Sequence, residues 1–287
     1  MPSRRELRQL PYPDDIPRAK RALGQNFLID PNVQRKIVAA LGAGPDDEVL
    51  EIGPGVGALT RHLAGRVRRL VLVELDDGLA ARLGEEFAGD PSVEVINEDV
   101  LGVPLERISA DPGRLKVIGN IPYNITTPIL FGLLERRPRP AAIVLMVQRE
   151  VADRILEPAG SKTYGALAVG VQAVAEVSRV MNVSRDAFRP IPDVMSSVVR
   201  IVPHDPPRLS PEDEAALREL TRAAFQQRRK QFQRILRDAW DLSVDEVAEV
   251  GRAAAMDLVQ RPETFSPQKF IDLARVLRDR DTEPATG

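Results

Sequence analysis

The feature that most constrains the fold of this chain is a regular alternation of short apolar runs with segments of helical pattern. The apolar runs cover residues 48–52, 70–73, 93–96, 115–118 and 143–147, and helical patterns lie between them, as at 58–64. Strands that are apolar throughout are typical of a parallel sheet whose two faces are both covered by helices. We therefore predict an α/β domain.

The second half of the chain departs from this alternation. Two further strand candidates, residues 177–183 and 197–202, are joined by a loop too short to hold a crossover helix, so we expect antiparallel pairing. A Pro-rich stretch, "PHDPPRLSPED", follows, and beyond about Glu212 the pattern is helical. We predict an N-terminal arm over 1–30, a main α/β domain over 31–204 and a helical C-terminal domain over 205–287.

Composition argues against several classes of protein. The 287 residues include 43% hydrophobic residues, no cysteine and two histidines, with a formal charge of −2. Two histidines leave little material for a metal site or a hydrolase triad, and without cysteine there is no disulfide framework. The longest apolar run, 141–147, is far shorter than the roughly 20 residues of a membrane helix. We expect a soluble cytoplasmic protein with no metal and no membrane contact.

Three features stand where successive strands of the predicted sheet end, which is where open parallel sheets bind ligands. The first is the glycine-rich "EIGPGVG", which permits a tight turn and close approach of a ligand to the backbone. Glu74 follows Gly53 by 21 residues, a spacing that suits a carboxylate bound to ribose hydroxyls. Asp99 closes "INED" and could accept from an adenine amino group, although a single acid there is also a common turn former. Together they predict an adenosine-type ligand.

The glycine-rich segment also satisfies the loose dinucleotide pattern G-x-G-x-x-G/A, which alone is a weak signal. A nicotinamide enzyme would leave two other features without a role. One is "GNIPY" at residues 119–123, and the other is a basic segment at 217–237. The alternative for the basic segment is a solvated helix face. S-adenosylmethionine is therefore the favoured cofactor.

The stretch "GNIPY" suits methyl transfer to an exocyclic adenine amine. Such an amine is a poor nucleophile, because its lone pair is delocalised into the ring. The Asn120 oxygen and a carbonyl held by the rigid Ile121-Pro122 unit could accept its two N–H bonds. Tyr123 offers a stacking face for an unpaired or flipped base. Thr127-Pro128 signals the start of a helix just after this stretch.

With these residues in view, the chain resembles the KsgA (RsmA) family of small-subunit rRNA adenine dimethyltransferases. The likeness covers nearly the whole chain, and its motifs in order are "KRALGQNFLID", "VLEIGPGVGALT", "LVELD", "NEDV", "GNIPYNITTPIL", "LMVQREVADRI", "GSKTYGAL", "AFRPIPDVMSSVVRI" and "AFQQRRKQF". The resemblance implies a Rossmann-like, seven-stranded methyltransferase domain with a small helical rRNA-binding domain. It also implies dimethylation of two adjacent adenines in a hairpin loop near the 3′ end of small-subunit rRNA, on a pre-assembled particle. We expect a monomer.

The resemblance also implies roles for particular residues. Cofactor contacts fall on Asn26, Leu28, Gly53, Glu74, Asp99 and Asn120, and chemistry or base stacking on Asn120, Pro122, Tyr123 and Phe188. Phe188 has an ordinary alternative as a loop anchor. The basic helix expected around Arg228, Arg229 and Lys230 should contact rRNA phosphates.

Three positions depart from the usual pattern of that family: Leu23 replaces a common aromatic, Asp193 replaces a usual lysine, and "RRKQFQRIL" lacks a usual Asn. They bear on rRNA docking, not on the chemistry. Two alternatives stay open. One is the macrolide-resistance rRNA methyltransferase family, which acts on one adenine of large-subunit rRNA. The other is a ribosome-assembly or transcription factor of the same ancestry, although the intact "NIPY", Glu74 and Asp99 favour catalysis.

Overall fold

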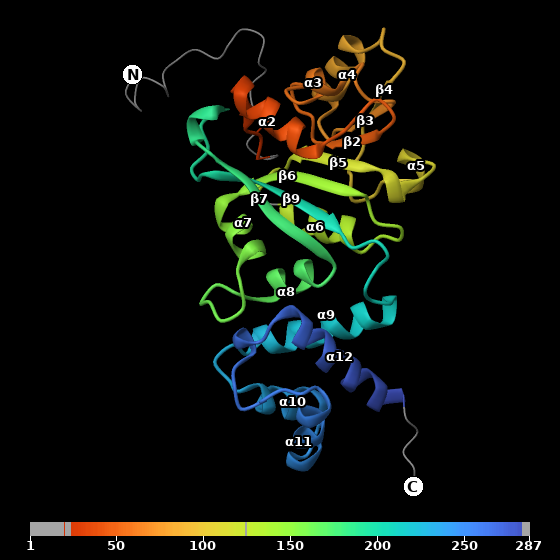
Figure 1. Cartoon of the computed structure of the whole chain (residues 1–287). Coiled ribbons are helices and arrows are strands. Elements are labelled where there is room, and N and C mark those ends of the chain that lie inside the picture. The colour runs from red at the N-terminus through yellow and green to blue at the C-terminus, as the bar shows by residue number, and fades with distance from the viewer. Residues whose placement is uncertain (1–19, 21–23, 124, 283–287) are drawn as a thin grey trace. The chain divides into compact units, whose positions relative to one another are not determined.

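The computed structural model describes residues 20, 24–123 and 125–282, and Figure 1 shows its elements. Seven strands form one sheet in the order β4-β3-β2-β5-β6-β9-β7. Their bounds are β2 (Glu48–Ile52), β3 (Arg69–Val73), β4 (Val93–Ile96), β5 (Lys116–Asn120), β6 (Ala142–Gln148), β7 (Ala175–Val183) and β9 (Ser196–Pro203). Neighbours among β2 to β6 are parallel, whereas β9 runs antiparallel to β6. The predicted seven-stranded α/β fold is confirmed, and the later pair of strands, β9 and β7, are neighbours at one edge.

Helices connect the parallel strands, as the alternation predicts. Those between parallel strands are α3 (Thr60–Leu63), α4 (Asp77–Glu86), α5 (Leu105–Ile108) and α6 (Thr126–Leu134). The other helices are α2 (Pro31–Leu41), α7 (Arg149–Leu156), α8 (Ala166–Gln172), α9 (Pro211–Gln226), α10 (Phe232–Trp240), α11 (Val244–Ala253) and α12 (Pro267–Thr282). Single 3-10 turns are η2 (Pro112–Arg114), η3 (Arg185–Ala187) and η4 (Pro262–Thr264). The α6 helix starts one residue before the expected Thr127. Within the described ranges, every helix is too short or too polar to span a bilayer.

The order of the strands places a switch point beside β2. The chain passes from β2 outward through β3 and β4, then returns to β5 on the other side of β2. Ile52, the last residue of β2, lies opposite Gly119 in the β2/β5 register. A Cβ atom on Gly119 would lie 2.8 Å from the Ile52 carbonyl oxygen, so only glycine fits there. The crevice at such a reversal is where open α/β sheets bind ligands.

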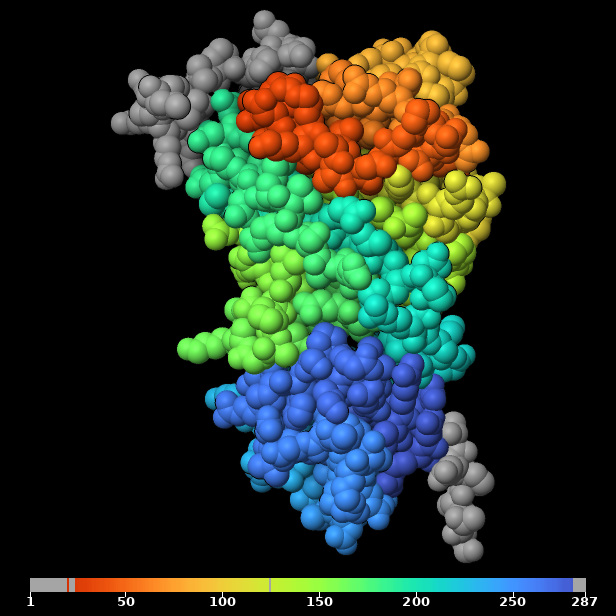
Figure 2. Space-filling view, viewed as in Figure 1, coloured from red at the N-terminus to blue at the C-terminus, as the bar shows by residue number. Residues whose placement is uncertain are grey.

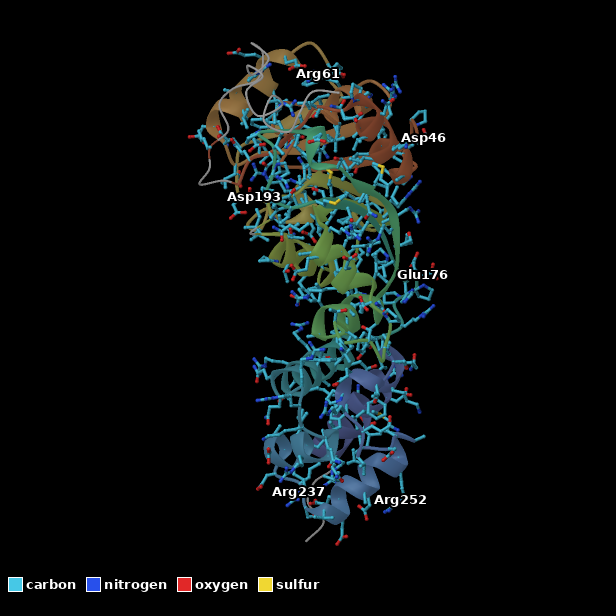
Figure 3. The ribbon with its side chains drawn as sticks, turned by 90° about the vertical axis from the view of Figure 1, so that its left-hand side faces the viewer. Asp46, Arg61, Glu176, Asp193, Arg237 and Arg252 are labelled. Carbon is cyan, nitrogen blue, oxygen red and sulfur yellow. The ribbon has the colours of Figure 1, made fainter. Side chains whose placement is uncertain are left out.

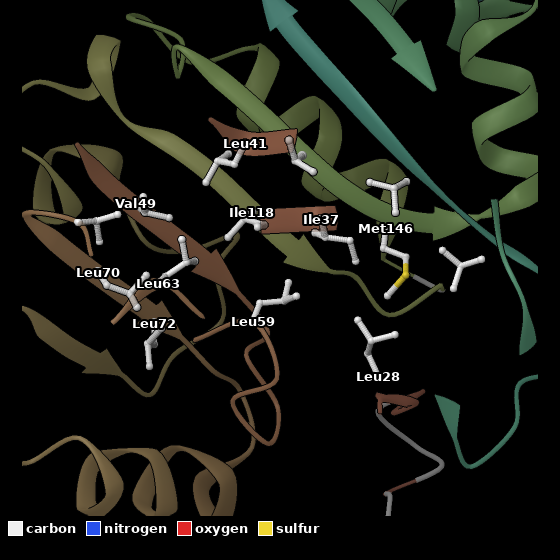
Figure 4. Close-up of a cluster of buried hydrophobic side chains, with 14 of the residues drawn as sticks. Leu28, Ile37, Leu41, Val49, Leu59, Leu63, Leu70, Leu72, Ile118 and Met146 are labelled. Atoms are coloured by element: carbon white, nitrogen blue, oxygen red, sulfur yellow. The ribbon is translucent and has the colours of Figure 1, made fainter. Parts of the chain in front are cut away.

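Aliphatic side chains fill the core around the sheet, and Figure 4 shows a group of them from β2, β3, β5, β6 and the flanking helices. Leu28 belongs to this cluster and is 2% exposed. It lies on β1 (Phe27–Leu28), which pairs antiparallel with β8 (Phe188–Arg189) in a separate two-stranded sheet. This small sheet attaches the segment before α2 to the main core.

The chain forms two compact units. The first unit comprises residues 1–152 and 178–203, and the second comprises 153–177 and 204–287, so the division falls within α7 and β7. This grouping differs from the domains expected from sequence, because residues 153–177 are grouped with the C-terminal helices. Segments 153–177 and 204–287 share one core: α8 packs against α9 and α12.

Aromatic rings form a cluster within the core of the second unit. Phe225 and Phe270 stack with centroids 5.5 Å apart, and Phe232 and Tyr164 contact the same group. Figure 2 shows the last helices, in blue, gathered into one continuous body. Because only 4% of the chain is aromatic, this cluster uses a large share of its rings. Large apolar side chains contribute most per residue to the stability of a small helical unit.

Candidate active site

A pocket in the first unit lies at the carboxyl ends of β2, β3 and β5, beside the switch point. Its walls come from the arm residues 24–28, the loop after β2, the residues after β3 and β4, and residues 120–123. Every cofactor residue expected from the sequence lines it, namely Asn26, Leu28, Gly53, Glu74, Asp99 and Asn120. The structure therefore gathers in one place side chains that are far apart in the sequence.

The glycine-rich loop forms one wall of this pocket. Gly53 and Gly55 have φ angles of +62° and +59°, a region that favours glycine. A Cβ atom on Gly55 would lie 3.3 Å from the ring of Phe27, so the loop also leaves room for the arm. The helix after the loop, α3, is shorter than expected and begins only at Thr60. The loop itself, not a helix end, shapes this wall.

Glu74 is a buried carboxylate in the pocket wall, with 6% of its surface exposed. Its Oε2 accepts from the N–H of Gly55 and its Oε1 from the N–H of Asp76, both at 2.9 Å. Burial raises the pKa of Glu74, and the two backbone hydrogen bonds partly offset this. Each carboxylate oxygen can accept a further bond, so the group remains able to receive hydroxyl donors.

Sequence reasoning assigned no role to Glu51, which also lines the pocket. This side chain is 2% exposed and accepts a hydrogen bond of 2.8 Å from the Thr60 hydroxyl. Burial, with a contribution from the neighbouring charge of Glu74, raises the pKa of Glu51 to about 8. Glu51 is therefore mostly a neutral acid at pH 7. The signal was present, since an acid between the apolar residues Leu50 and Ile52 of a predicted buried strand is unusual.

Asp99 lies at the mouth of the pocket and is exposed. Its Oδ1 accepts from the N–H of Leu101 at 3.0 Å, which is the turn-forming contact considered above as its alternative role. The two roles are compatible, because a carboxylate has a second oxygen.

Asn120 ends β5 and has its amide oriented by the arm. Its Nδ2 donates to the carbonyl of Asn26 at 3.0 Å. This bond uses the amino side of the amide, so Oδ1 is the atom left to accept a bond. Among the described residues, Oδ1 has no partner.

Tyr123 is tethered by its hydroxyl and also lines the pocket. Its Oη lies 2.8 Å from Oγ of Ser196, a fully buried residue at the start of β9. Burial raises the pKa of Tyr123, and the bond to Ser196 partly offsets this. The sequence contained no signal for Ser196 beyond its place in "DVMSSVVRI". The tether fixes the position of the hydroxyl end of the ring.

Phe188 is placed differently from the other expected residues. Its side chain is 1% exposed and packs in the core cluster, opposite Leu28 in the β1/β8 pair. It does not line the pocket. The packing corresponds to the loop anchor considered as its alternative, and stacking on a base would require the ring to leave the core.

The sequence predicted a helix at Arg228, Arg229 and Lys230, and this prediction is wrong. These residues lie in the turn 227–231 between α9 and α10. We call this segment the basic turn. A helix cannot continue there because the backbone of Gln227 leaves helical geometry, with a ψ angle of 39°. Arg237, labelled in Figure 3, is exposed on α10.

One of the unusual positions can be located. Asp193 is exposed on the loop before β9 (Figure 3), and Leu23 lies outside the described residues. Asp193 therefore places a negative charge on the surface of the first unit.

The pocket suits S-adenosylmethionine. Gly53 and Gly55 leave room for close approach, the buried Glu74 can accept from hydroxyls, and apolar side chains such as Leu75, Val100 and Ile129 provide walls for an adenine ring. The fold and this site define a Rossmann-like methyltransferase that uses S-adenosylmethionine.

Comparisons with known proteins identify the family. The family model of ribosomal RNA adenine dimethylase matches residues 16–272. The ribosomal RNA small subunit methyltransferase A of Geobacter metallireducens is 41% identical over 263 residues, covering 91% of this chain and 96% of that protein. The protein of the same name from Chlorobium luteolum is 45% identical over 260 residues, covering 90% of each. The chain belongs to the ribosomal RNA adenine dimethylase family and is an S-adenosylmethionine-dependent enzyme.

Solved structures show the same fold. A dimethyladenosine transferase from Plasmodium falciparum matches with a TM-score of 0.77 at 25% identity, covering 86% of this chain and 95% of that one. The 23S rRNA methyltransferase ErmE matches with a TM-score of 0.69 at 27% identity, covering 88% and 99%. The small-subunit enzymes above are closer in sequence than ErmE.

Proposed function

We propose that this chain transfers methyl groups to N6 of two adjacent adenines in the 3′-terminal hairpin loop of small-subunit rRNA, as a monomer acting on a pre-assembled ribosomal particle in the cytoplasm. Family membership and the names of the relatives support the substrate class. The observation that carries the chemistry is the orientation of Asn120, whose amide oxygen is left as an acceptor in the pocket.

The backbone after Asn120 supports the second part of that chemistry. The carbonyl of Pro122 already accepts from the N–H of Ile125 and, at 3.4 Å, from the hydroxyl of Thr126. The carbonyl of Ile121 has no partner among the described residues and is thus our candidate for the second acceptor. Two acceptors on the amine would draw its nitrogen toward tetrahedral geometry and free the lone pair for attack.

The remaining roles follow from position. Glu74 would hold the ribose hydroxyls, Asp99 the adenine amino group and Gly53 the methionine end, while Asn26 and Leu28 would cover the cofactor. When bound, the cofactor supplies an already activated methyl group, so no general base or metal is required. Tyr123 would stack on the target base, and the pre-positioning of both reactants would supply much of the acceleration.

The decisive experiment is mass mapping of methylated adenines on both rRNAs. We would compare a deletion strain with strains complemented by the parent gene and by Asn120→Ala. We expect dimethylation of two adjacent small-subunit adenines to return only with the parent gene. Restoration of a large-subunit adenine would instead favour the macrolide-resistance type, and full restoration by Asn120→Ala would mean that the Asn120 acceptor is not needed. If no methylated adenine depends on the parent gene, the non-catalytic assembly role is favoured.

A further inference from the structure

A single buried carboxylate, Asp76, connects the N-terminal arm to the pocket. Asp76 is 4% exposed and caps α4, with Oδ1 accepting from the N–H of Gly78 and Leu79. Its other oxygen, Oδ2, accepts from Nε2 of Gln25 at 3.1 Å and pairs with Nζ of Lys20 at 2.9 Å. The backbone N–H of Lys20 in turn donates to Oε1 of Gln25 at 2.7 Å. The arm therefore binds Asp76 through Nε2 of Gln25 and Nζ of Lys20, and the amide oxygen of Gln25 links these two arm residues.

Asp76 and the arm also form hydrogen bonds with two residues to which we assign roles in the pocket, Glu74 and Asn120. The N–H of Asp76 donates to Oε1 of Glu74, the expected ribose acceptor. On the other side, the residue after Gln25 is Asn26, whose carbonyl accepts from Nδ2 of Asn120. Two consecutive arm residues thus contact the cofactor side and the catalytic side of one pocket.

We propose that Asp76 docks the arm and that Gln25 and Asp76, through Asn26, set the orientation of the Asn120 amide. Gln25 and Asp76 are thus positioning residues for methyl transfer. The inference rests on the proposed function only for the activity readout below.

The chemistry of the contact fits this role. Burial alone would raise the pKa of Asp76, but the hydrogen bonds from Lys20 and Gln25 more than offset it, so the pKa lies below its ordinary range. The carboxylate is therefore ionised, and bonds to ionised groups are stronger than neutral ones. Without the Asn26 carbonyl in place, the Asn120 amide could turn over and present its NH₂ group to the amine, where no acceptor would remain.

The test compares Asp76→Asn and Gln25→Ala with a matched control, Asp30→Asn. Asp30 caps α2 as Asp76 caps α4, accepting from the N–H of Asn32 and Val33, and none of its described side-chain bonds involves Lys20 or Gln25. We expect kcat for methyl transfer to immature small subunits to fall about 10- to 100-fold in both test variants, with KM for the particle unchanged. The double variant should be no worse than the worse single one, because both changes remove the same contact.

Hydrogen exchange of the amides of residues 24–28 gives a readout independent of activity. We expect faster exchange in Asp76→Asn and Gln25→Ala and parental exchange in Asp30→Asn, with melting temperatures measured on the same preparations. Parental exchange in both test variants, or equal losses of kcat in Asp30→Asn, would overturn the proposal. If the parent enzyme itself methylates no small-subunit adenine while the exchange pattern holds, the proposed function fails and the docking role of Asp76 stands.

Discussion

The strand-end pocket of the first unit holds a buried charged side chain, whereas the charged side chains of the basic turn of the second unit are exposed. In the pocket, the carboxylate of Glu74 is buried and held by two backbone N–H groups. In the basic turn, three consecutive cations are all exposed. Arg228 donates to the carbonyls of Lys162 and Tyr164, both at 2.8 Å, and Lys230 pairs with Asp238. Arg229 has no such bond among the described residues.

Burial decides what a charged residue can do. A buried polar group must be paired, because an unpaired one costs several kcal/mol, so its position is fixed by its partners. An exposed cation pays no such penalty and can serve either as a bond to the protein or as a contact for a partner. Substitutions in the pocket should therefore have larger effects than those in the basic turn, and the following changes test this order.

The largest effect is expected at Glu51, on the pH dependence of the free energy of unfolding. The folded chain holds a proton on this acid up to about pH 8, whereas the unfolded chain releases it near the ordinary value of 4.5. Its contribution to the free energy of unfolding is therefore present at low pH and is lost as pH rises toward 8. The total loss is up to roughly 5 kcal/mol, at about 1.4 kcal/mol per pH unit. Glu51→Gln keeps an acceptor for Thr60 and should flatten this fall, leaving a smaller slope of the same sign from Glu74.

Chemical denaturation from pH 5 to pH 9 measures this change. Glu85→Gln, at an exposed carboxyl of α4, is the control and should keep the parental profile. A Glu51→Gln profile parallel to that of the parent would mean that the acid is ionised in the folded enzyme.

The next largest effect concerns Asn120. Asn120→Ala removes the acceptor that acts mainly in the transition state, so kcat should fall by about 100- to 1,000-fold, the range seen when one preorganised hydrogen-bonding group is removed. Cofactor affinity by calorimetry should change far less. Near-parental methyl transfer would require the acceptor mechanism to be abandoned.

Two substitutions at Tyr123 test the role of the ring and the role of the hydroxyl separately. Tyr123→Ala should lower kcat/KM by about 5- to 150-fold, because stacking on a base is worth about 1–3 kcal/mol. Tyr123→Phe keeps the ring and should retain most activity. Ser196→Ala removes the same tether from the other side, so the double variant Tyr123→Phe, Ser196→Ala should be no worse than either single one. If Tyr123→Phe is as inactive as Tyr123→Ala, the hydroxyl carries the role.

The smallest effects should come from the basic turn, where they differ by residue. Arg229→Ala should leave the melting temperature unchanged and reduce the log–log salt slope of particle binding by about 0.7–0.9. Arg228→Ala should lower the melting temperature, because the guanidinium holds the Lys162 and Tyr164 carbonyls and lies 5.9 Å over the ring of Phe225. A parental salt slope in Arg229→Ala would make the turn a solvated surface.

The local elements and the main polar groups of the site could be predicted from the amino-acid sequence alone. The strands of the sheet begin and end within two residues of the predicted runs, because strand burial leaves a continuous apolar signal. The glycine-rich loop, Glu74, Asp99 and "GNIPY" were also visible, because each directly follows a predicted strand, and parallel strands end at one edge of a sheet.

Which of these groups contact one another depends on the three-dimensional fold. Gln25 meets Asp76 across 51 residues, Asn120 meets Asn26 across 94, and Tyr123 meets Ser196 across 73. Hydrophobic periodicity reports which face of an element is buried, but not which distant polar atom will satisfy a buried donor. That choice depends on strand order and packing, which also buried Phe188 and gave Arg228 and Lys230, but not Arg229, a hydrogen-bond partner among the described residues. Sequence thus specifies the chemical groups of this site, and the fold specifies their orientation.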